Sequence, residues 1–363
     1  MGSFNKNSQK FIFLFTVIVV AVVARIGYAG LSASPTDSQT ASSTAMTGTN
    51  PPHIILEPPV ENAAPSSSAS LLQTAIASAD AAGGGSGVND NTAAATQAAY
   101  FGEANTTQSI FARTTAQTAV PSFSKTALLV SDITNNVDLA AINVDTRWPT
   151  ASLTKLMTAT LVLDHLSLDT RITITPQMFA VDPAGEHTLV VNGTYTVSDL
   201  LHVMLMPSSN GAAEALADYY GHAQFMTEMN ARAAQWGMTN TYFDDPSGLS
   251  AANESSAHDL AILATHVYQN YPTILSYTDT PQITITELQS GAKVSVKSIN
   301  DFAGDANFVG GKTGYIPQAA DNLLSLFRYN GKPVLIIVLG AADTAQRFGD
   351  TTKLLNWFTM NYR

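Results

Sequence analysis

The sequence predicts an α+β domain in which distant parts of the chain complete one antiparallel sheet and a mostly helical lobe is inserted beside it. Strand-like apolar runs occur at both ends of the globular region, over Thr126–Val144 and Leu323–Leu339. Helical patterns fill the stretch between them. The strongest of these, over Ser152–Leu166, is apolar on most sides and is therefore expected in the middle of the domain.

Turn residues between short apolar runs predict three β-hairpins. The strongest signal is Asn330-Gly331, because an Asn-Gly pair tolerates the positive φ angles of a type I′ turn. The predicted hairpins pair Thr126–Asp132 with Leu139–Val144, Ile283–Glu287 with Lys293–Ile299, and Leu323–Tyr329 with Pro333–Leu339.

The remaining elements are predicted to be helices from their apolar periodicity and the polar residues at their ends. Pro207–Asn210 separates two of them and should form a short connection. The predicted helices are Ser152–Leu166, Val197–Met206, Gly211–Tyr220, Phe225–Trp236, His258–Asn270 and Thr344–Tyr362.

Composition excludes several classes of function. The chain has 363 residues and a formal net charge of -11, so no basic surface is expected that could bind nucleic acid. It contains no cysteine, which excludes disulfides, thiol nucleophiles and thiolate metal sites. Its histidines show no metal-ligand spacing, which argues against a zinc peptidase.

The N-terminal region predicts export. Lys6 and Lys10 precede the apolar run Phe11–Ala24, which is followed by Arg25. This pattern is typical of a signal peptide, although an uncleaved anchor with N-terminal membrane contact stays open. The predicted organisation is a leader or anchor over residues 1–31, a flexible Ser-, Thr-, Ala- and Gly-rich linker over 32–108, and a globular domain over 109–363. Either form of the leader places that domain outside the cytoplasm.

A serine and a lysine one helical turn apart begin the apolar helix. In Ser152-Leu153-Thr154-Lys155, positions i and i+3 share a helix face, so the Lys155 amine can reach the Ser152 hydroxyl. A neutral lysine can take the proton of a serine and make it a nucleophile. The simpler alternative is a helix-capping serine.

Two further polar strings complete the pattern. Ser208 and Asn210 lie between two predicted helices, where a hydroxyl can relay a proton and an amide can bind a substrate; plain helix capping is the alternative. Lys312-Thr313-Gly314 lies on a predicted edge strand, where an amine and a hydroxyl suit a carboxylate and a glycine leaves room for substrate backbone. A solvated lysine beside a turn is the alternative there. A phosphate-binding loop is rejected, because Ala306 stands where that pattern needs glycine.

The three strings in this order resemble the signature of β-lactamases and penicillin-binding proteins. The chain is most similar to the low-molecular-weight penicillin-binding proteins of the D-alanyl-D-alanine carboxypeptidase family, from about Thr126 to its end. Supporting stretches include Tyr195–Leu201, Gly237–Thr241, Pro246–Leu249 and Ala257–Ala261. The family often has Ala-Gly where this chain has Ala319-Ala320-Asp321, which leaves the local strand geometry open.

The resemblance implies a β-lactamase/transpeptidase-like fold and makes residues 109–363 a serine D,D-peptidase domain. Peptidoglycan stem peptides would be the substrate, β-lactams would be covalent inhibitors, and no metal or cofactor would be needed. The implied catalytic residues are Ser152 as nucleophile, Lys155 as base and Ser208 as proton relay. The implied substrate-binding residues are Asn210, Lys312, Thr313, Gly314 and Tyr315, with backbone N–H groups of residues 152 and 315 forming the oxyanion hole.

The most favoured activity is that of a D-alanyl-D-alanine carboxypeptidase. The segment Lys312–Ala319 looks like the endopeptidase branch of the family, so cleavage of crosslinks stays open. A β-lactamase would need a carboxylate that activates water, and Asp244 and Asp245 offer no characteristic loop for one. A non-catalytic wall-binding protein is disfavoured, because all three strings carry intact chemistry. The sequence does not determine the oligomeric state.

Overall fold

The fold of the chain is taken from a computed structural model that describes residues 108–115, 117–123, 127–180 and 188–363. The expected leader (1–31) and all but the last residue of the expected linker (32–108) lie outside these ranges and stay predictions. Within the described ranges, no helix combines the length and the apolar character needed to cross a membrane.

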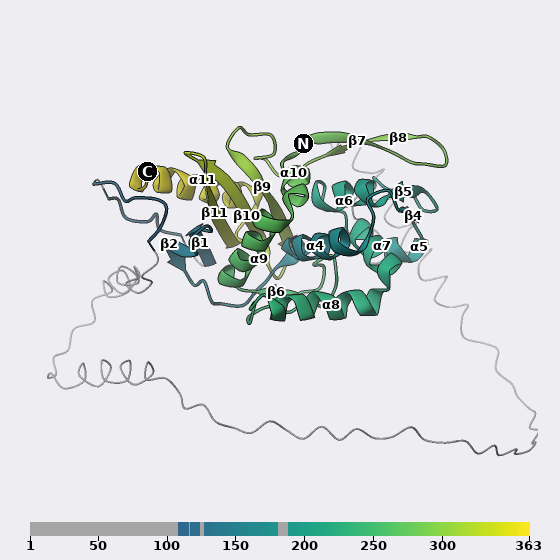
Figure 1. The fold of residues 1–363 in the computed structure, drawn as a ribbon, viewed down its shortest axis with the longest axis horizontal. Coiled ribbons are helices and arrows are strands. Elements are labelled where there is room, and N and C mark those ends of the chain that lie inside the picture. The colour runs from purple at the N-terminus through teal and green to yellow at the C-terminus, as the bar shows by residue number, and fades with distance from the viewer. Residues whose placement is uncertain (1–107, 116, 124–126, 181–187) are drawn as a thin grey trace, which may run out of the picture. The chain divides into compact units, whose positions relative to one another are not determined.

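A five-stranded antiparallel sheet forms the centre of the described domain, in the order β2-β1-β11-β10-β9 (Figure 1). Two of its strands come from the start of the domain and three from its end, as the sequence predicted. The order places β9 at one edge, which confirms the edge-strand prediction for Lys312. The strands are β1 (Ala127–Asp132), β2 (Val137–Ile142), β9 (Phe308–Ile316), β10 (Ala320–Tyr329) and β11 (Lys332–Ala341).

The tight turns adopt backbone φ angles that their residues favour. Asn330 and Gly331 have φ angles of 50° and 79°, so the β10–β11 connection is the hairpin that the Asn-Gly pair predicted. Asn136, between β1 and β2, also has a positive φ of 53°. Asparagine tolerates this region better than most residues with a β-carbon.

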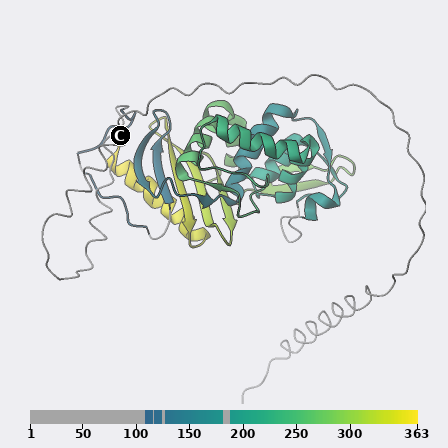
Figure 2. The ribbon, with the colours of Figure 1, turned by 90° about the horizontal axis from the view of Figure 1, so that it is seen from below.

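The sheet is buried on both faces, which explains the continuous apolar run of β11. Val334, Ile336 and Val338 pack in one core with helix α11 (Thr344–Asn361). The alternate residues Leu335, Ile337 and Leu339 pack in the other core, beneath the helical lobe. Figure 2 shows the sheet between α11 and that lobe. A strand covered on both sides is apolar at successive positions rather than at every second one.

The helical lobe confirms the predicted helices and adds elements that the sequence did not reveal. Helix α10 was not predicted, because its eight residues follow directly on α9; Pro272 begins it at a position where a missing N–H does no harm. The lobe and its flanking helices are α4 (Lys155–His165), α5 (Pro176–Ala180), α6 (Val197–Leu205), α7 (Asn210–Tyr220), α8 (His222–Gln235), α9 (Ala257–Asn270) and α10 (Pro272–Asp279).

Three short antiparallel pairs join the loops, and two of the three were not predicted. The predicted hairpin forms from β7 (Gln282–Thr286) and β8 (Lys293–Lys297). Its end is tied to the lobe by Glu287, whose carboxylate accepts a hydrogen bond from the Thr194 backbone N–H at 2.7 Å. The other pairs are β4 (Arg171–Thr173) with β5 (Thr194–Thr196), and β3 (Trp148–Pro149) with β6 (Glu254–Ser255). The architecture confirms the predicted α+β class.

Candidate active site

The Ser152 hydroxyl lies on a tight turn at the start of the central helix. Residues Ala151–Thr154 form a single 3₁₀ turn that runs directly into α4. Ser152 caps neither helix, because the N-cap positions are Thr150 and Thr154. Its side chain is half-buried, and Ala151 before it has a φ of 49°. The alternative of a plain capping serine is therefore not what the structure contains.

The Lys155 amine is fully buried and lies beside that hydroxyl. Its Nζ is 2.9 Å from Ser152 Oγ, 2.7 Å from Asn210 Oδ1 and 2.5 Å from the Ser247 carbonyl oxygen. The last two oxygens can only accept hydrogen bonds, so the amine must donate a hydrogen to each of them. A neutral amine then has its lone pair left for the Ser152 hydroxyl. This is the geometry that a general base requires.

In the second string, one residue caps helix α7 and the other two lie in the site. Ser209 is the N-cap of α7, and its hydroxyl accepts from the Ala212 backbone N–H at 3.2 Å. Of the three residues in this string, only Ser209 caps the helix. Ser208 has a φ of 69°, and Asn210 opens α7 with its amide oxygen on Lys155. The hydroxyl of Ser208 accepts a hydrogen bond from Lys312 Nζ at 2.8 Å, so the second and third strings meet there.

The Lys312 amine is buried with only 1% of its surface exposed. It also donates to the carbonyl oxygen of Thr313 at 3.0 Å. Burial first, and then the nearby charges of Lys155 and Arg347, hold the pKa of Lys312 well below its usual range. A bound carboxylate would offset this cost of burying a cation, which suits Lys312 to an anionic group of a substrate.

Gly314 lies against the turn that carries Ser152. A β-carbon at this position would lie 2.9 Å from the Thr150 carbonyl oxygen and 3.2 Å from the Ser152 nitrogen. The neighbour of Gly314 is thus the protein's own backbone, whereas the sequence suggested that the glycine makes room for substrate. The next residue, Tyr315, is 60% exposed. Strand β9 therefore passes close to the backbone nitrogen of Ser152, one of the two expected oxyanion donors, at the residue just before Tyr315.

Two side chains that the sequence did not single out fix this turn to the sheet. Asn322 on β10 donates from Nδ2 to the carbonyl oxygens of Pro149 and Thr150, at 2.9 and 3.2 Å. Trp148 donates from its indole N–H to the carbonyl oxygen of Ala319 at 2.9 Å. These contacts link residues more than 150 positions apart, so no local pattern could have revealed them.

A buried ion pair between Arg347 and Asp321 contacts the Lys312–Gly314 segment. Arg347 on α11 contacts the carboxylate of Asp321 at 2.9 Å and donates to the Gly314 carbonyl oxygen at 3.4 Å. Burial lowers the pKa of Arg347, and the charge of Asp321 opposes that effect. The sequence marked Ala319-Ala320-Asp321 as a departure from the family. In the structure, Ala320 keeps a positive φ of 52°, the backbone that a glycine would adopt without strain.

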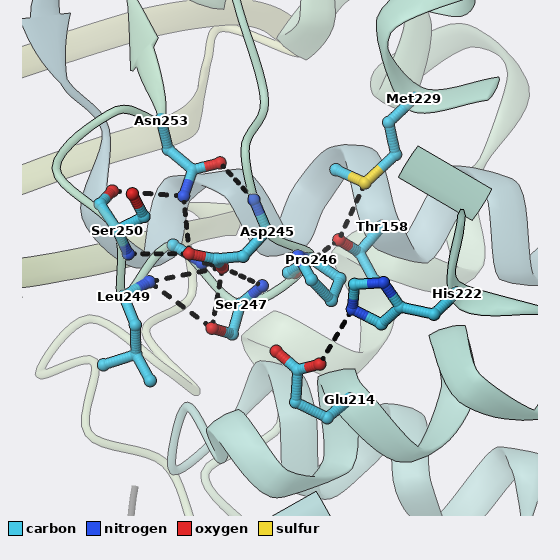
Figure 3. A network of polar contacts seen from close by, with 11 residues as sticks. Thr158, Glu214, His222, Met229, Asp245, Pro246, Ser247, Leu249, Ser250 and Asn253 are labelled. Atoms are coloured by element: carbon cyan, nitrogen blue, oxygen red, sulfur yellow. Dashed lines mark hydrogen bonds and ion pairs between the residues drawn. The ribbon is translucent and has the colours of Figure 1, made fainter. Parts of the chain in front are cut away.

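The loop before α9 supplies the Ser247 carbonyl that holds Lys155. Figure 3 shows the carboxylate of Asp245 inside this loop, surrounded by donors from Ser247, Leu249, Ser250 and Asn253. The sequence noted Pro246–Leu249 only as a supporting stretch. Asp245 was weighed there only as a water-activating carboxylate, and in the structure its oxygens bind their own loop instead.

A buried carboxylate lies one helical turn beyond Asn210. Glu214 contacts His222 at 3.2 Å (Figure 3), and ligand atoms of Glu214, Asp218 and His222 lie within 4.8 Å of one another. Burial, above all, raises the pKa of Glu214. The sequence assigned no metal-ligand role to the histidines, which stays a prediction; in the structure the ring of His222 contacts the Glu214 carboxylate.

Comparisons with known proteins place the chain in a single family. A family model described as D-alanyl-D-alanine carboxypeptidase matches residues 112–343. The chain is 32% identical to the D-alanyl-D-alanine endopeptidase of Escherichia coli over 258 residues, covering 68% of this chain and 81% of that protein. The crystal structure of the Streptomyces K15 DD-transpeptidase superposes with a TM-score of 0.61 at 29% identity, covering 66% of this chain and 98% of that one. Penicillin-binding protein D2 from Listeria monocytogenes, in its ampicillin-bound form, gives a TM-score of 0.55 at 33% identity, with 64% and 95% covered.

Proposed function

Because the chain belongs to the D-alanyl-D-alanine carboxypeptidase family of serine peptidases, we propose that Ser152 is the nucleophile with which it cleaves D-alanyl bonds of peptidoglycan stem peptides. The observation that carries this proposal is the placement of the Lys155 amine. Two acceptor-only oxygens take its hydrogens, and the third direction faces the Ser152 hydroxyl at 2.9 Å.

The proposed reaction proceeds through an acyl-enzyme. Lys155 takes the proton of Ser152 while Oγ bonds to the D-alanyl carbonyl carbon. The carbonyl oxygen becomes an oxyanion, held by the backbone N–H groups of residues 152 and 315. Losing one such donor typically costs about 2.7–4 kcal/mol of transition-state stabilisation. The proton then passes to the leaving amine through Ser208 as the C–N bond breaks, and water releases the acyl group from Ser152.

Substrate recognition is assigned to the residues around this pair. Lys312 and Thr313 would bind a carboxylate of the peptide, and the Lys312 charge would oppose protonation of Lys155. Asn210 would bind a peptide amide while holding Lys155, and Gly314 and Tyr315 would lie along the peptide. The same site would be acylated by β-lactams, as the ampicillin complex of the Listeria relative suggests.

The main candidate activity is removal of a terminal D-alanine, which is the activity named in the matched family description. Cleavage of crosslinks is the second candidate, and the similarity to the Escherichia coli endopeptidase favours it. Mass spectrometry of digested muropeptides separates them. Loss of one alanine from monomers marks a carboxypeptidase, and conversion of dimers to monomers marks an endopeptidase.

The proposed location is the cell envelope. Peptidoglycan lies outside the cytoplasm, and the basic and apolar residues of positions 6–25 fit an export signal or anchor. Intact-mass measurement of the protein purified from an envelope fraction would decide between a cleaved leader and a retained one.

The test of the nucleophile is covalent labelling by penicillin. The wild-type protein should gain the mass of one β-lactam, and Ser152→Ala should gain none. Ser167→Ala is a matched control, because this exposed serine lies just beyond the far end of α4. An adduct that persists in Ser152→Ala would reject the assignment. Rapid turnover of nitrocefin would instead favour a β-lactamase, and a correctly folded protein with no adduct would favour a wall-binding role.

A further inference from the structure

The loop of residues 244–253 is organised around one carboxylate. Asp245 lies at its centre, and its two oxygens accept hydrogen bonds from both ends of the loop (Figure 3). Its Oδ1 accepts four hydrogen bonds: from Ser247 N at 2.7 Å, Ser247 Oγ at 2.8 Å, Gly248 N at 2.6 Å and Leu249 N at 3.3 Å. Its Oδ2 accepts two, from Ser250 N at 2.6 Å and Asn253 Nδ2 at 2.9 Å.

These contacts require an ionised acid rather than any small polar side chain. Both oxygens of Asp245 face donors, and an amide would turn an N–H toward one of those donor sets. Burial alone would raise the pKa of Asp245, but the hydrogen bonds from Ser250, Ser247 and Gly248 outweigh burial and lower it. The side chain is therefore a carboxylate at neutral pH.

The loop is hydrogen-bonded to the central helix, α4. The carbonyl oxygen of Ser247 accepts from Lys155, and that of Pro246 accepts from the Thr158 hydroxyl at 2.6 Å, one turn further along α4. At the other end of the loop, the Asn253 carbonyl oxygen accepts from the backbone N–H of Thr150 at 2.8 Å. The same loop thus contacts the residues before and after the Ser152 turn.

We propose that Asp245 is a positioning residue for acyl transfer, which holds the Ser247 carbonyl against the Lys155 amine and so directs the lone pair of that amine at Ser152. The inference rests on the proposed function of Ser152 and Lys155. The hydrogen bonds of Asp245 go to its own loop rather than to Ser152 or Lys155. Its effect is on the fraction of molecules in which the base points at the nucleophile.

The step affected is the formation of the acyl-enzyme. Without the carboxylate, the turn of residues 245–250 relaxes, and the Ser247 carbonyl moves away from Lys155. The amine can then rotate, and a misplacement of a catalytic group by about 1 Å costs roughly a hundredfold in rate. Substrate binding should change little, because Lys312 and Thr313 lie on β9 rather than on this loop.

The experiment compares Asp245→Asn with wild type in the full-length protein. Acylation by a fluorescent penicillin, followed over a range of concentrations, separates the limiting rate of acylation from the apparent dissociation constant. We expect the limiting rate to fall by roughly ten- to a hundredfold and the dissociation constant to change by less than about twofold. Asp244→Asn is the matched control, because it makes the same change at an exposed neighbouring position and should leave both quantities unchanged.

Normalising the rate to the acylated fraction separates positioning from folding. Intact mass gives that fraction, so a merely structural role would lower the amount of adduct and the melting temperature but leave the rate per acylated site unchanged. That result would overturn the inference. If Asp245→Asn does not fold, Ser247→Ala replaces it, since this variant removes the hydroxyl that anchors Ser247 to Asp245 but leaves residue 247 with the backbone carbonyl whose position is under test.

For Ser247→Ala we expect a severalfold smaller limiting rate with an unchanged dissociation constant, and a wild-type rate would overturn the inference. Failure of the proposed function gives a different result. In that case the wild-type protein itself would form no adduct, or Ser152→Ala would form one.

Discussion

Gly248 lies directly against the backbone carbonyl of Ala151, so closely that a β-carbon on Gly248 would overlap the carbonyl group. The φ of Gly248 is 84°, a conformation that glycine adopts without strain. Two loops separated by almost a hundred residues therefore meet without an intervening side chain, beside Ser152, the proposed nucleophile.

Gly248→Ala should consequently slow acylation by roughly a hundredfold. The new methyl group cannot be accommodated by rotating a side chain, because the group it meets is backbone. Either the Ser247 carbonyl or the Ser152 turn must move, and a shift of about 1 Å at either costs roughly a hundredfold in acylation rate. The measurement is the rate of labelling by fluorescent penicillin.

Gly237→Ala provides the control for Gly248→Ala. The φ of Gly237 is 79°, but a β-carbon there would meet nothing within 4 Å. It should lower the free energy of unfolding by about 0.5–1 kcal/mol, because the strain of a left-handed residue with a β-carbon exceeds the lower entropy of the unfolded alanine chain, and leave the acylation rate intact. Equal acylation rates in both variants would show that contact between the two loops does not matter.

The sequence predicted the sheet and most helices because their signals are local. The apolar runs around Asn330-Gly331 and the apolar helix after Ser152 each carry their pattern within a few residues. Helix α10 was missed because Pro272–Asp279 is short and adjoins another helix. The β4–β5 pair was missed because strands of three residues show no periodicity.

The site was predictable where side chains carry the chemistry. Ser152 and Asn210 contact Lys155, and Ser208 contacts Lys312, so the three polar strings come together as their order suggested. The Ser247 carbonyl could not be predicted, because every residue has a backbone oxygen and only the fold decides which one meets an amine. The roles of Asn322 and Arg347 depend on distant contacts in the same way.

Asn210→Asp should move the pH dependence of acylation toward higher pH. The amide oxygen of Asn210 lies 2.7 Å from Lys155 Nζ, and a carboxylate in its place would favour the charged ammonium form, which cannot accept a proton. We expect the acid limb of the plot of acylation rate against pH to shift to higher pH by roughly one to three units.

The measurement is the acylation rate between about pH 5 and about pH 10, a range that lies between the ordinary pKa values of a carboxylate, about 4, and of a lysine, about 10.4. Asn356→Asp is the control, because Asn356 is exposed on α11 and the substitution adds the same charge. An unshifted profile in Asn210→Asp would mean that Lys155 is not the group that takes the proton.

Ala320→Gly should stabilise the domain. Ala320 has a φ of 52°, where a β-carbon costs about 1–2 kcal/mol. Glycine removes that strain but adds entropy to the unfolded chain, worth about 0.5–1 kcal/mol in the opposite direction. The net gain in unfolding free energy should be about 0.5–1 kcal/mol, measured by urea denaturation.

Ala223→Gly, at an exposed position in α8, makes the same substitution where the backbone is helical and should destabilise by about 0.5–1 kcal/mol. The signs of the two changes should therefore be opposite. Destabilisation by Ala320→Gly would show that the β-carbon of Ala320 contributes packing that exceeds its backbone strain.

His258 joins helix α9 to the edge of the sheet as a charged bridge. Its Nε2 is 2.7 Å from Asp138 on β2, and its Nδ1 is 2.7 Å from Asp145. The hydrogen bond to Asp138 is the main cause that raises the pKa of His258 to about 9; burial opposes it, and Asp145 adds to it. An unperturbed histidine titrates near 6.5, so the folded protein binds the proton more tightly than the unfolded chain does.

The bridge therefore stabilises the fold most below pH 6.5, and its contribution is lost as the pH rises through about 9. We expect the unfolding free energy of wild type to exceed that of His258→Gln at pH 6, and the difference to shrink steadily toward pH 10. His266→Gln is the control. Burial lowers the pKa of His266 below the ordinary value near 6.5, so this residue is neutral in both the folded and unfolded states from about pH 8, and its difference from wild type should stay flat from there to about pH 10. A His258→Gln difference that is the same at pH 6 and pH 10 would mean that the bridge carries no proton-linked stability.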